Sequence, residues 1–436
     1  MADPLDRAID AADLLAPEQV RAATRRIVAV APVVDMHTHL FPPQFGDLCR
    51  SGIDDLLTYH YLAAELLRSS PITPDAYQRL PLPARADLVW QTLFVRNTPL
   101  SEATRGVVGI LAALGLDAAA PDLQEARAFF ATRTAADHVS WVLDRAGVES
   151  IVMTNDPFDP REASVWAERT RIDPRFRSAL RLDVLLNEWP LARNRVRNAG
   201  FTVTEDVDDQ TVLGARKFLD HWIARIEPLY VAVSLPDDFS FPEQSARSRL
   251  IERVVLPACR DHHLPLAMMI GVRRGVNPAL LDAGDGLGRA DVGVVQRMCR
   301  DYPDHRFLVT MLSRENQHEL CVAARKFANL MPFGCWWFLN NPSIVSEITR
   351  ERLELLGPSF IAQHSDARVL EQLLYKWPHA RRDVAEALAD QYVRLLEAGR
   401  SVTEADISRD VYRLFRGNFG AWTMAPAGVE REVEQR

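Results

Sequence analysis

The chain has 436 residues, of which 47% are hydrophobic and 25% are charged, values typical of a folded globular protein with a sizeable core. Its net charge is −8 and its basic residues are scattered, which argues against a nucleic-acid-binding protein. The five cysteines form no Cys-x-x-Cys pattern, and no apolar run approaches the roughly 18 residues of a membrane span. Together with an acidic first segment that lacks signal-peptide features, this composition predicts a cytoplasmic protein without nucleic-acid or membrane partners, and it leaves a homo-oligomer open.

Short apolar runs alternate with longer amphipathic stretches along most of the chain, as in βα units around a parallel sheet. The eight predicted strands are 33–36, 150–153, 177–182, 229–234, 264–270, 306–311, 330–335 and 360–363. Each run after the first lies far enough from its predecessor for a crossover helix. Eight parallel strands favour closure, so we predict an α/β fold of the (β/α)8 TIM-type barrel class.

The longest interval between two predicted strands, residues 40–147, reads as several helices interrupted by prolines. Because it follows strand one at the mouth where barrel active sites are built, we expect a helical cap over the site. The predicted organisation is an N-terminal helix and strand one in residues 1–39, the cap in 40–147, the rest of the barrel in 148–423 and a polar tail in 424–436. Within the barrel, apolar spacing predicts one helical stretch over residues 381–413.

The first predicted strand ends in His37 and His39, and the two-residue period of a strand points both side chains to the same side. Closure of a barrel puts the eighth strand beside the first, so Asp366 could meet the two histidines. Two imidazoles and one carboxylate make an open site for Zn²⁺ or a similar divalent ion. Simpler explanations exist, since the histidines could be packed or solvated and Ser365 with Asp366 could cap a helix.

Short polar motifs follow the predicted strands in a fixed order. They are His37-x-His39, His60-Tyr61, Asp156-Pro157, Arg181-Leu182-Asp183, Gly271 with Arg273-Arg274, Arg314-Glu315-Asn316, Gly334 with Trp336-Trp337, and Ser365-Asp366-x-Arg368. Each motif alone is weak, but the ordered set resembles the uronate isomerases of the amidohydrolase superfamily over residues 33–415. The resemblance implies metal binding by His37, His39 and Asp366, and substrate handling by His60, Tyr61, Arg181 and Arg368.

The resemblance implies an aldose-ketose isomerase that moves a hydrogen between C2 and C1 of a hexuronate through an enediol. D-Glucuronate would give D-fructuronate and D-galacturonate would give D-tagaturonate, and the sequence does not choose between these sugar acids. An arginine fork suits the substrate carboxylate, and Arg181, Arg314 and Arg368 are the arginines placed at strand ends. Trp336 is a further candidate for substrate binding, as a wall of the pocket.

The expected proton shuttle is Tyr61 or Asp366, with His60 as a third catalytic candidate. A carboxylate bound directly to a divalent cation is a poor base, so Asp366 can serve only if its metal bond is loose or passes through water. Tyr61 lies within a helical pattern, where a tyrosine is usually a packing residue. The choice between these two residues stays open at this point.

One departure from the family pattern lies on the fifth predicted strand, where many members carry a histidine and this chain has Met269. This difference is typical of a divergent branch of the family. The main alternative function is a mononuclear metal-dependent hydrolase or lyase acting on a small carboxylate, and a third reading is a non-catalytic barrel. A two-metal hydrolase is disfavoured because strand four, 231–234, has no lysine that could bridge two ions.

Overall fold

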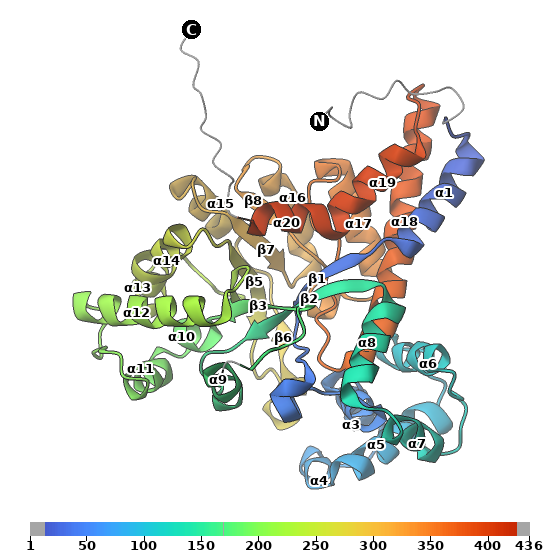
Figure 1. Cartoon of the computed structure of the whole chain (residues 1–436), viewed down its shortest axis with the longest axis horizontal. Coiled ribbons are helices and arrows are strands. Elements are labelled where there is room, and N and C mark those ends of the chain that lie inside the picture. Colours follow the sequence, from blue (N-terminus) through green and yellow to red (C-terminus); the bar gives the residue numbers. More distant parts are fainter. Residues whose placement is uncertain (1–13, 169, 425–436) are drawn as a thin grey trace.

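A computed structural model describes residues 14–168 and 170–424 (Figure 1). Seven parallel strands lie side by side in the order β1-β2-β3-β4-β5-β7-β8. Their bounds are β1 Val33–Thr38, β2 Val148–Asn155, β3 Phe176–Arg181, β4 Val231–Pro236, β5 Leu266–Arg273, β7 Phe307–Met311 and β8 Leu330–Pro332. The first seven predicted strands are therefore confirmed, with ends shifted by a few residues. Their nearly continuous burial is typical of parallel strands covered by helices.

The predicted eighth strand is shorter than expected, yet the chain still closes the barrel there. Ile361 forms one isolated parallel bridge with Phe333, just after β8. On the other side, the Asp366 amide donates to the His37 carbonyl of β1 at 3.1 Å. No regular ladder forms over 360–363, where Oε1 of Gln363 accepts from the Cys335 amide at 2.6 Å in place of a backbone bond, and the chain then turns away at Asp366, whose φ is +50°. We call residues 360–367 the closing segment.

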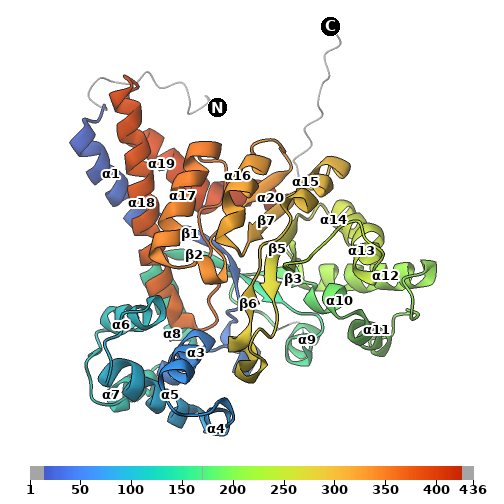
Figure 2. The ribbon, with the colours of Figure 1, turned by 180° about the vertical axis from the view of Figure 1, so that it is seen from behind.

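A short strand that the sequence did not predict, β6 (Gly286–Leu287), pairs antiparallel with β5. Two residues are too few to produce a readable pattern. The chain reaches β6 through a turn of 3-10 helix, η5 (Pro278–Gly284), which contacts α3 (His60–Ser69). The loop after β5 and the segment after β1 therefore meet at the carboxyl ends of the strands (Figure 2).

The long segment between β1 and β2 is helical, as the proline-punctuated pattern indicates. Besides α3, its elements are η2 Pro43–Leu48, α2 Ile53–Leu57, α4 Pro74–Gln78, α5 Leu82–Trp90, η3 Gln91–Val95, α6 Glu102–Leu114, α7 Gln124–Ala131 and α8 Ala135–Ala146. Figures 1 and 2 show α3 to α7 gathered at one end of the barrel. The last helix, α8, instead packs against β2 and α18 and so belongs to the barrel wall.

The predicted helical stretch over 381–413 is interrupted in the structure. Helix α18 spans Leu373–Glu397 and packs along α1, Pro17–Val30. Gly399, just after the end of α18, has a φ of +86°, a conformation that stops a helix. Thr403 then caps the next helix, α19, Glu404–Tyr412. Apolar spacing alone did not reveal the break.

The remaining helical elements connect or follow the strands. They are α9 Pro160–Ala167, α10 Asp183–Asn187, α11 Trp189–Asn198, α12 Asp209–Ile226, α13 Ala246–Leu250, η4 Ile251–Val255, α14 Leu256–Asp261, α15 Val292–Asp301, η6 Arg314–Asn316, α16 Gln317–Ala324, η7 Trp337–Leu339, α17 Pro342–Leu356, η8 Leu370–Gln372, η9 Arg413–Gly417 and α20 Asn418–Thr423. Within the described residues, no helix is both long and apolar enough to cross a membrane. The predicted polar tail, apart from Met424, lies outside the described residues.

Candidate active site and metal centre

Three potential metal ligands meet where β1 lies beside the closing segment. His37 is part of β1, His39 follows it directly, and Asp366 belongs to the closing segment. One ligand atom of each residue lies within 4.8 Å of the other two. Nε2 of His39 is 3.4 Å from Oδ1 of Asp366, and Nε2 of His37 is 3.9 Å from the same oxygen. The structure thus brings together the three residues predicted as metal ligands.

Two buried hydroxyl groups orient the imidazoles. The Tyr230 hydroxyl donates to the carbonyl of the residue before His37 at 2.6 Å, so its oxygen accepts from Nδ1 of His37 at 3.1 Å. Thr154 does the same for His39: it donates to the preceding carbonyl at 3.0 Å and accepts from Nδ1 at 2.8 Å. Both protons are therefore assigned to Nδ1, which leaves the Nε2 lone pairs directed toward Asp366.

Burial sets the charge state of this cluster. It lowers the pKa of His37 to about 3 and that of His39 to about 4, so both imidazoles are neutral at pH 7. Burial opposes ionisation of Asp366, but the close approach of His39, at 3.4 Å, and the nearby charge of Lys376 hold the pKa of Asp366 far below its ordinary value. The cluster thus offers two neutral nitrogen donors and one carboxylate, which together carry a single negative charge.

The donor atoms fit a divalent metal ion. Among the described residues, Nε2 of His37 and Oδ1 of Asp366 are buried and have no hydrogen-bond partner. Buried polar atoms are nearly always paired, so two such atoms facing each other indicate a ligand between them. Two nitrogens and one oxygen make an open coordination set, which leaves positions for water or substrate.

A cavity of about 160 Å³ opens next to the cluster at the carboxyl ends of the strands. Its lining residues are His37, His39, His60, Arg181, Ser234, Met269, Arg274, Asp282, Asp285, Trp336, Trp337, Asp366 and Arg368. Typical small-molecule pockets measure roughly 300–1,000 Å³, so this cavity suits a ligand of few atoms. Most of its lining is polar or charged, which indicates a hydrophilic ligand.

Two predicted arginines line the cavity in different electrostatic settings. Arg181, at the end of β3, donates to Asp183 at 2.6 Å, and Asp183 in turn accepts from the Ser234 amide at 2.8 Å. The pairing with Asp183 raises the pKa of Arg181 and fixes its guanidinium. Arg368 makes no ion pair within 4 Å in the part of the chain that the structure describes. Arg368 is therefore the arginine available to a carboxylate ligand, whereas Arg181 is already partnered.

His60 and Tyr61 begin α3 of the cap, with ring centroids 4.6 Å apart. His60 lines the cavity, and burial lowers its pKa to about 3. Tyr61 faces a neighbouring space of about 30 Å³ that Glu102 and Lys376 also line. Burial raises the pKa of Tyr61 well above 10, so its hydroxyl keeps its proton at neutral pH and can donate it.

The other two predicted substrate contacts differ in position. Trp336 lines the cavity and is 4% exposed, beside Trp337 at a centroid distance of 6.0 Å. Arg314 does not reach the cavity: it forms an exposed ion pair with Glu347 at 2.9 Å. It opens the turn of η6, where Asn316 is buried and Arg314 points to the outside of the barrel. Its prediction as a substrate ligand is corrected accordingly.

Several residues of the site were not assigned a role by the sequence. Tyr230, which directly precedes β4, and Thr154, in β2, contact the histidines, and no local motif marks them. Arg274 was part of an ordered motif without a role, and it lines the cavity from the loop after β5. His364 has both ring nitrogens buried without a partner in the described chain, with its ring 5.5 Å from that of His37. Only its place beside Ser365-Asp366 could have drawn notice to it.

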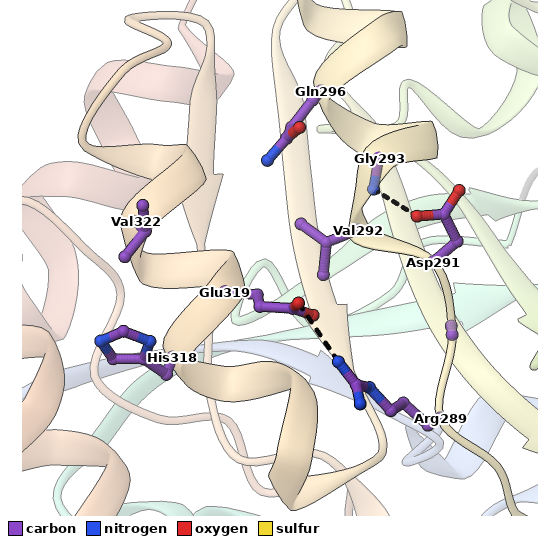
Figure 3. A pocket seen from close by; sticks show the side chains of 9 residues that line it. Arg289, Asp291, Val292, Gly293, Gln296, His318, Glu319 and Val322 are labelled. Carbon is purple, nitrogen blue, oxygen red and sulfur yellow. Dashed lines mark hydrogen bonds and ion pairs between the residues drawn. The ribbon is translucent and has the colours of Figure 1, made fainter.

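A larger space, about 680 Å³, lies between α15 and α16 and is unrelated to the metal ligands (Figure 3). Its charged groups are satisfied within the protein: Arg289 pairs with Glu319 at 3.2 Å, and Asp291 accepts from the Gly293 amide at 2.8 Å. Because these groups already have partners and the groove is open to solvent, it offers no comparable set of ligand-binding atoms.

Comparison with solved structures identifies the family. A uronate isomerase from Bacillus halodurans C-125 is 50% identical in sequence, with a TM-score of 0.92, over 94% of this chain and 97% of that chain. The chain belongs to the uronate isomerase family.

Two more distant structures show the same fold. A uronate isomerase from Thermotoga maritima has 13% identity and a TM-score of 0.74, over 96% of this chain and 100% of that one.

A glucuronate isomerase from Caulobacter crescentus has 16% identity and a TM-score of 0.72, over 99% of this chain and 98% of that one. No protein-family model matches the chain, and no curated protein matches it. The likeness to solved uronate isomerases agrees with the family that the ordered sequence motifs indicate, and it supports the TIM-barrel fold.

Proposed function

We propose that this member of the uronate isomerase family interconverts an aldohexuronate and the corresponding ketose in a metal-containing site. The observation that carries the proposal is the meeting of His37, His39 and Asp366 with the unpaired Arg368 around one small polar cavity. The 50% identity with a solved uronate isomerase supports the same reaction class. A hydrophilic sugar acid matches the polar and charged lining of the cavity.

The metal ion is the expected cofactor, and we propose Zn²⁺ because two imidazoles and one carboxylate are a frequent ligand set of open zinc sites. His37, His39 and Asp366 would hold it through Nε2, Nε2 and a carboxylate oxygen. A bound divalent ion polarises substrate oxygens and stabilises negative charge that develops on them during enolisation. The lone pairs already point inward, since the Tyr230 and Thr154 hydroxyls hold both Nδ1 protons.

Arg368 would bind the substrate carboxylate. A guanidinium presents two parallel N–H donors that match the two carboxylate oxygens. Among the described residues, Arg368 has no ion-pairing partner like the one that occupies Arg181. Arg368 lines the same cavity as His37 and His39, so a ligand held by its carboxylate there lies next to the proposed metal ligands. Trp336 would exclude water from one wall of the cavity.

We assign proton transfer between C1 and C2 to Asp366, which lines the cavity, and to Tyr61, whose hydroxyl must reach the substrate from the neighbouring space of about 30 Å³. The high pKa of Tyr61 makes it a donor to a developing oxyanion, not a base. Asp366 is ionised at neutral pH and can accept a proton, provided that its bond to a metal ion is loose or passes through water. His60 stays neutral because burial lowers its pKa, and its Nε2, which has no partner in the described chain, can bind a substrate hydroxyl.

The test is incubation of the purified protein with D-glucuronate and with D-galacturonate, followed by detection of ketose by NMR. We expect ketose from at least one of the two sugar acids, and loss of the product in His37→Ala. The control is His318→Ala, which removes an exposed histidine from the groove of Figure 3. If neither sugar acid yields ketose while an amide, ester or lactone is hydrolysed in a His37-dependent way, the protein is a hydrolase and the proposal is wrong.

A cytoplasmic location is also proposed. All five cysteines are free, and Cys259, Cys299, Cys321 and Cys335 are buried, which agrees with a reducing compartment. Fractionation of the native host into cytoplasmic and exported proteins, followed by detection with an antibody, would test this location.

A further inference from the structure

Asp366 has a backbone conformation that differs from that of a strand. Its φ is +50°, in the left-handed region, which residues other than glycine adopt infrequently and aspartate and asparagine adopt more often than most. The residue lies in the closing segment, which forms one isolated bridge, between Ile361 and Phe333 just after β8, and reaches β1 through the bond from the Asp366 amide to the His37 carbonyl at 3.1 Å. Because no regular ladder supports this segment, the position of Asp366 depends on the groups that hold its backbone.

Two buried charged side chains hold the peptide groups just before Asp366. Oδ1 of Asp35 accepts from the Ser365 amide at 2.9 Å, and Nζ of Lys376 donates to the Ser365 carbonyl at 2.6 Å. The second oxygen of Asp35 accepts from Nε1 of Trp377 at 2.9 Å. Asp35 belongs to β1 and Lys376 to the first turn of α18. The amide and the carbonyl of Ser365 are therefore bound by charged side chains from two different elements.

Lys376 is unusual in this chain. The sequence has 51 lysines and arginines, and only three of them are lysines: Lys217, Lys326 and Lys376. Lys217 and Lys326 are exposed, whereas Lys376 is only 7% exposed. Burying an ammonium group is unfavourable unless it is paired, and here the carbonyl of Ser365 and the nearby carboxylates compensate it. Most basic residues of this chain are arginines, so a buried lysine indicates that this position requires a compact ammonium group instead of a planar guanidinium.

We propose that Lys376 and Asp35 are positioning residues, which clamp Ser365 and thereby hold the carboxylate of Asp366 in line with the two histidines. This inference rests on the proposed metal centre and extends it beyond the three ligands. Neither clamp residue lines the main cavity, so both act through Asp366. Outer-sphere contacts of this kind typically change metal affinity by about 10–100-fold.

The clamp predicts a definite sign for the effect of Lys376 on metal binding. A cation close to a divalent ion repels it, so loss of the lysine charge alone would tighten binding. Loss of the clamp would loosen Asp366 and weaken binding. Lys376→Met keeps the length and most of the packing of the side chain but removes the Nζ donor. The direction of the change in Zn²⁺ affinity therefore separates the clamp from a purely electrostatic role.

The experiment measures Zn²⁺ affinity of the full chain by competition with a chromogenic chelator, without sugar, for wild type, Lys376→Met and the exposed control Lys217→Met. We expect Lys376→Met to bind Zn²⁺ about 10-fold more weakly or worse, and Lys217→Met to match wild type. In the metal-free proteins, hydrogen exchange of the amides of residues 365–367 should be faster in Lys376→Met only. Unchanged or tighter Zn²⁺ binding by folded Lys376→Met, or unchanged exchange, would overturn the proposal.

If circular dichroism shows that Lys376→Met does not fold, Lys376→Arg takes its place. Arginine keeps the charge but carries its donors on a broader planar head, so Zn²⁺ binding should again weaken; unchanged or tighter binding overturns the clamp. Because Zn²⁺ is titrated without substrate, the result does not depend on sugar turnover. A protein that binds Zn²⁺ as expected but makes no ketose would refute the isomerase function and leave the clamp standing.

Discussion

Replacing Tyr230 with phenylalanine tests whether the orientation of the histidines creates the metal site. The hydroxyl of Tyr230 makes two buried hydrogen bonds, one donated to the Met36 carbonyl at 2.6 Å and one accepted from Nδ1 of His37 at 3.1 Å. The side chain is fully buried, and phenylalanine fits the same space. In the variant, Nδ1 of His37 has no acceptor, so the imidazole can carry its proton on Nε2, where it blocks metal binding.

The structure gives the size of the expected effects. A net contribution of about 0.5–1.5 kcal/mol for each of the two hydrogen bonds predicts a loss of about 1–3 kcal/mol in the free energy of unfolding of the metal-free protein. Removal of an outer-sphere partner of a ligating histidine predicts Zn²⁺ binding weaker by about 10–100-fold, equivalent to about 1.4–2.7 kcal/mol. The second effect is specific to His37, whereas the first would follow from any buried hydroxyl with two partners.

The assay combines urea denaturation of the metal-free protein with chelator competition for Zn²⁺. Tyr77→Phe is the matched control, since the Tyr77 hydroxyl is buried without a hydrogen-bond partner in the described chain and belongs to α4 of the cap. It should leave both measurements close to wild type. If Tyr230→Phe is destabilised as expected but binds Zn²⁺ as tightly as wild type, the hydroxyl does not set the histidine tautomer and this reasoning fails.

Four other substitutions or conditions give independent checks. Arg368→Lys should raise KM for the sugar acid strongly with little change in kcat, because a point charge cannot reproduce the two-pronged contact with a carboxylate. Tyr61→Phe should mainly lower kcat, by about 10²–10⁴-fold, because it removes a proton donor used in the transition state. Gly334→Ala should lower the melting temperature, since its Cβ would lie 1.8 Å from Nδ1 of His364 at a backbone φ of +56°. The metal-free protein should lose stability as pH falls from 6.5 toward 3, because burial lowers the pKa of His60 and His364 to about 3 and the unfolded chain takes up these protons first.

Each of these predictions has a contrasting result. Arg314→Lys alters an arginine outside the cavity and should leave KM unchanged; an equal rise in KM would remove the special role of Arg368. A Tyr61→Phe enzyme with wild-type kcat would exclude Tyr61 as the donor. A melting temperature unchanged in Gly334→Ala would mean that His364 can move aside. Stability that stays level between pH 6.5 and 3, followed by urea titration, would contradict buried neutral histidines.

The sequence predicted most of the barrel because buried parallel strands are continuous apolar runs, and seven such runs were long enough to read. The eighth run was harder to predict as a strand, because its polar side chains form hydrogen bonds where a regular strand would form a backbone ladder. Oε1 of Gln363, for example, accepts from the Cys335 amide at 2.6 Å, in place of a backbone rung. Strand β6 was missed because two residues leave no period, and the break after α18 was missed because a single glycine interrupts otherwise helical spacing.

The site divides in the same way. His37, His39 and Asp366 were predictable because strand ends and barrel closure fix where they meet, and the structure places them together. The hydrogen-bond partners of the imidazoles, Tyr230 and Thr154, were not predictable from the sequence. Their contacts depend on the register between strands that are distant in the sequence. Sequence order cannot supply that register.

Met269 explains why the outer contacts matter in this chain. It lines the cavity from β5, at the position where the resemblance to the family leads one to expect a histidine, and it is only 2% exposed. Its thioether is a poor ligand for a hard divalent ion, so the ion depends on the two histidines and Asp366. With fewer ligands, each one must be held more accurately, and Asp366 lies in a closing segment without a regular strand ladder. The hydroxyl of Tyr230 and the buried charge of Lys376 are therefore expected to contribute more to metal affinity here than they would beside an additional imidazole.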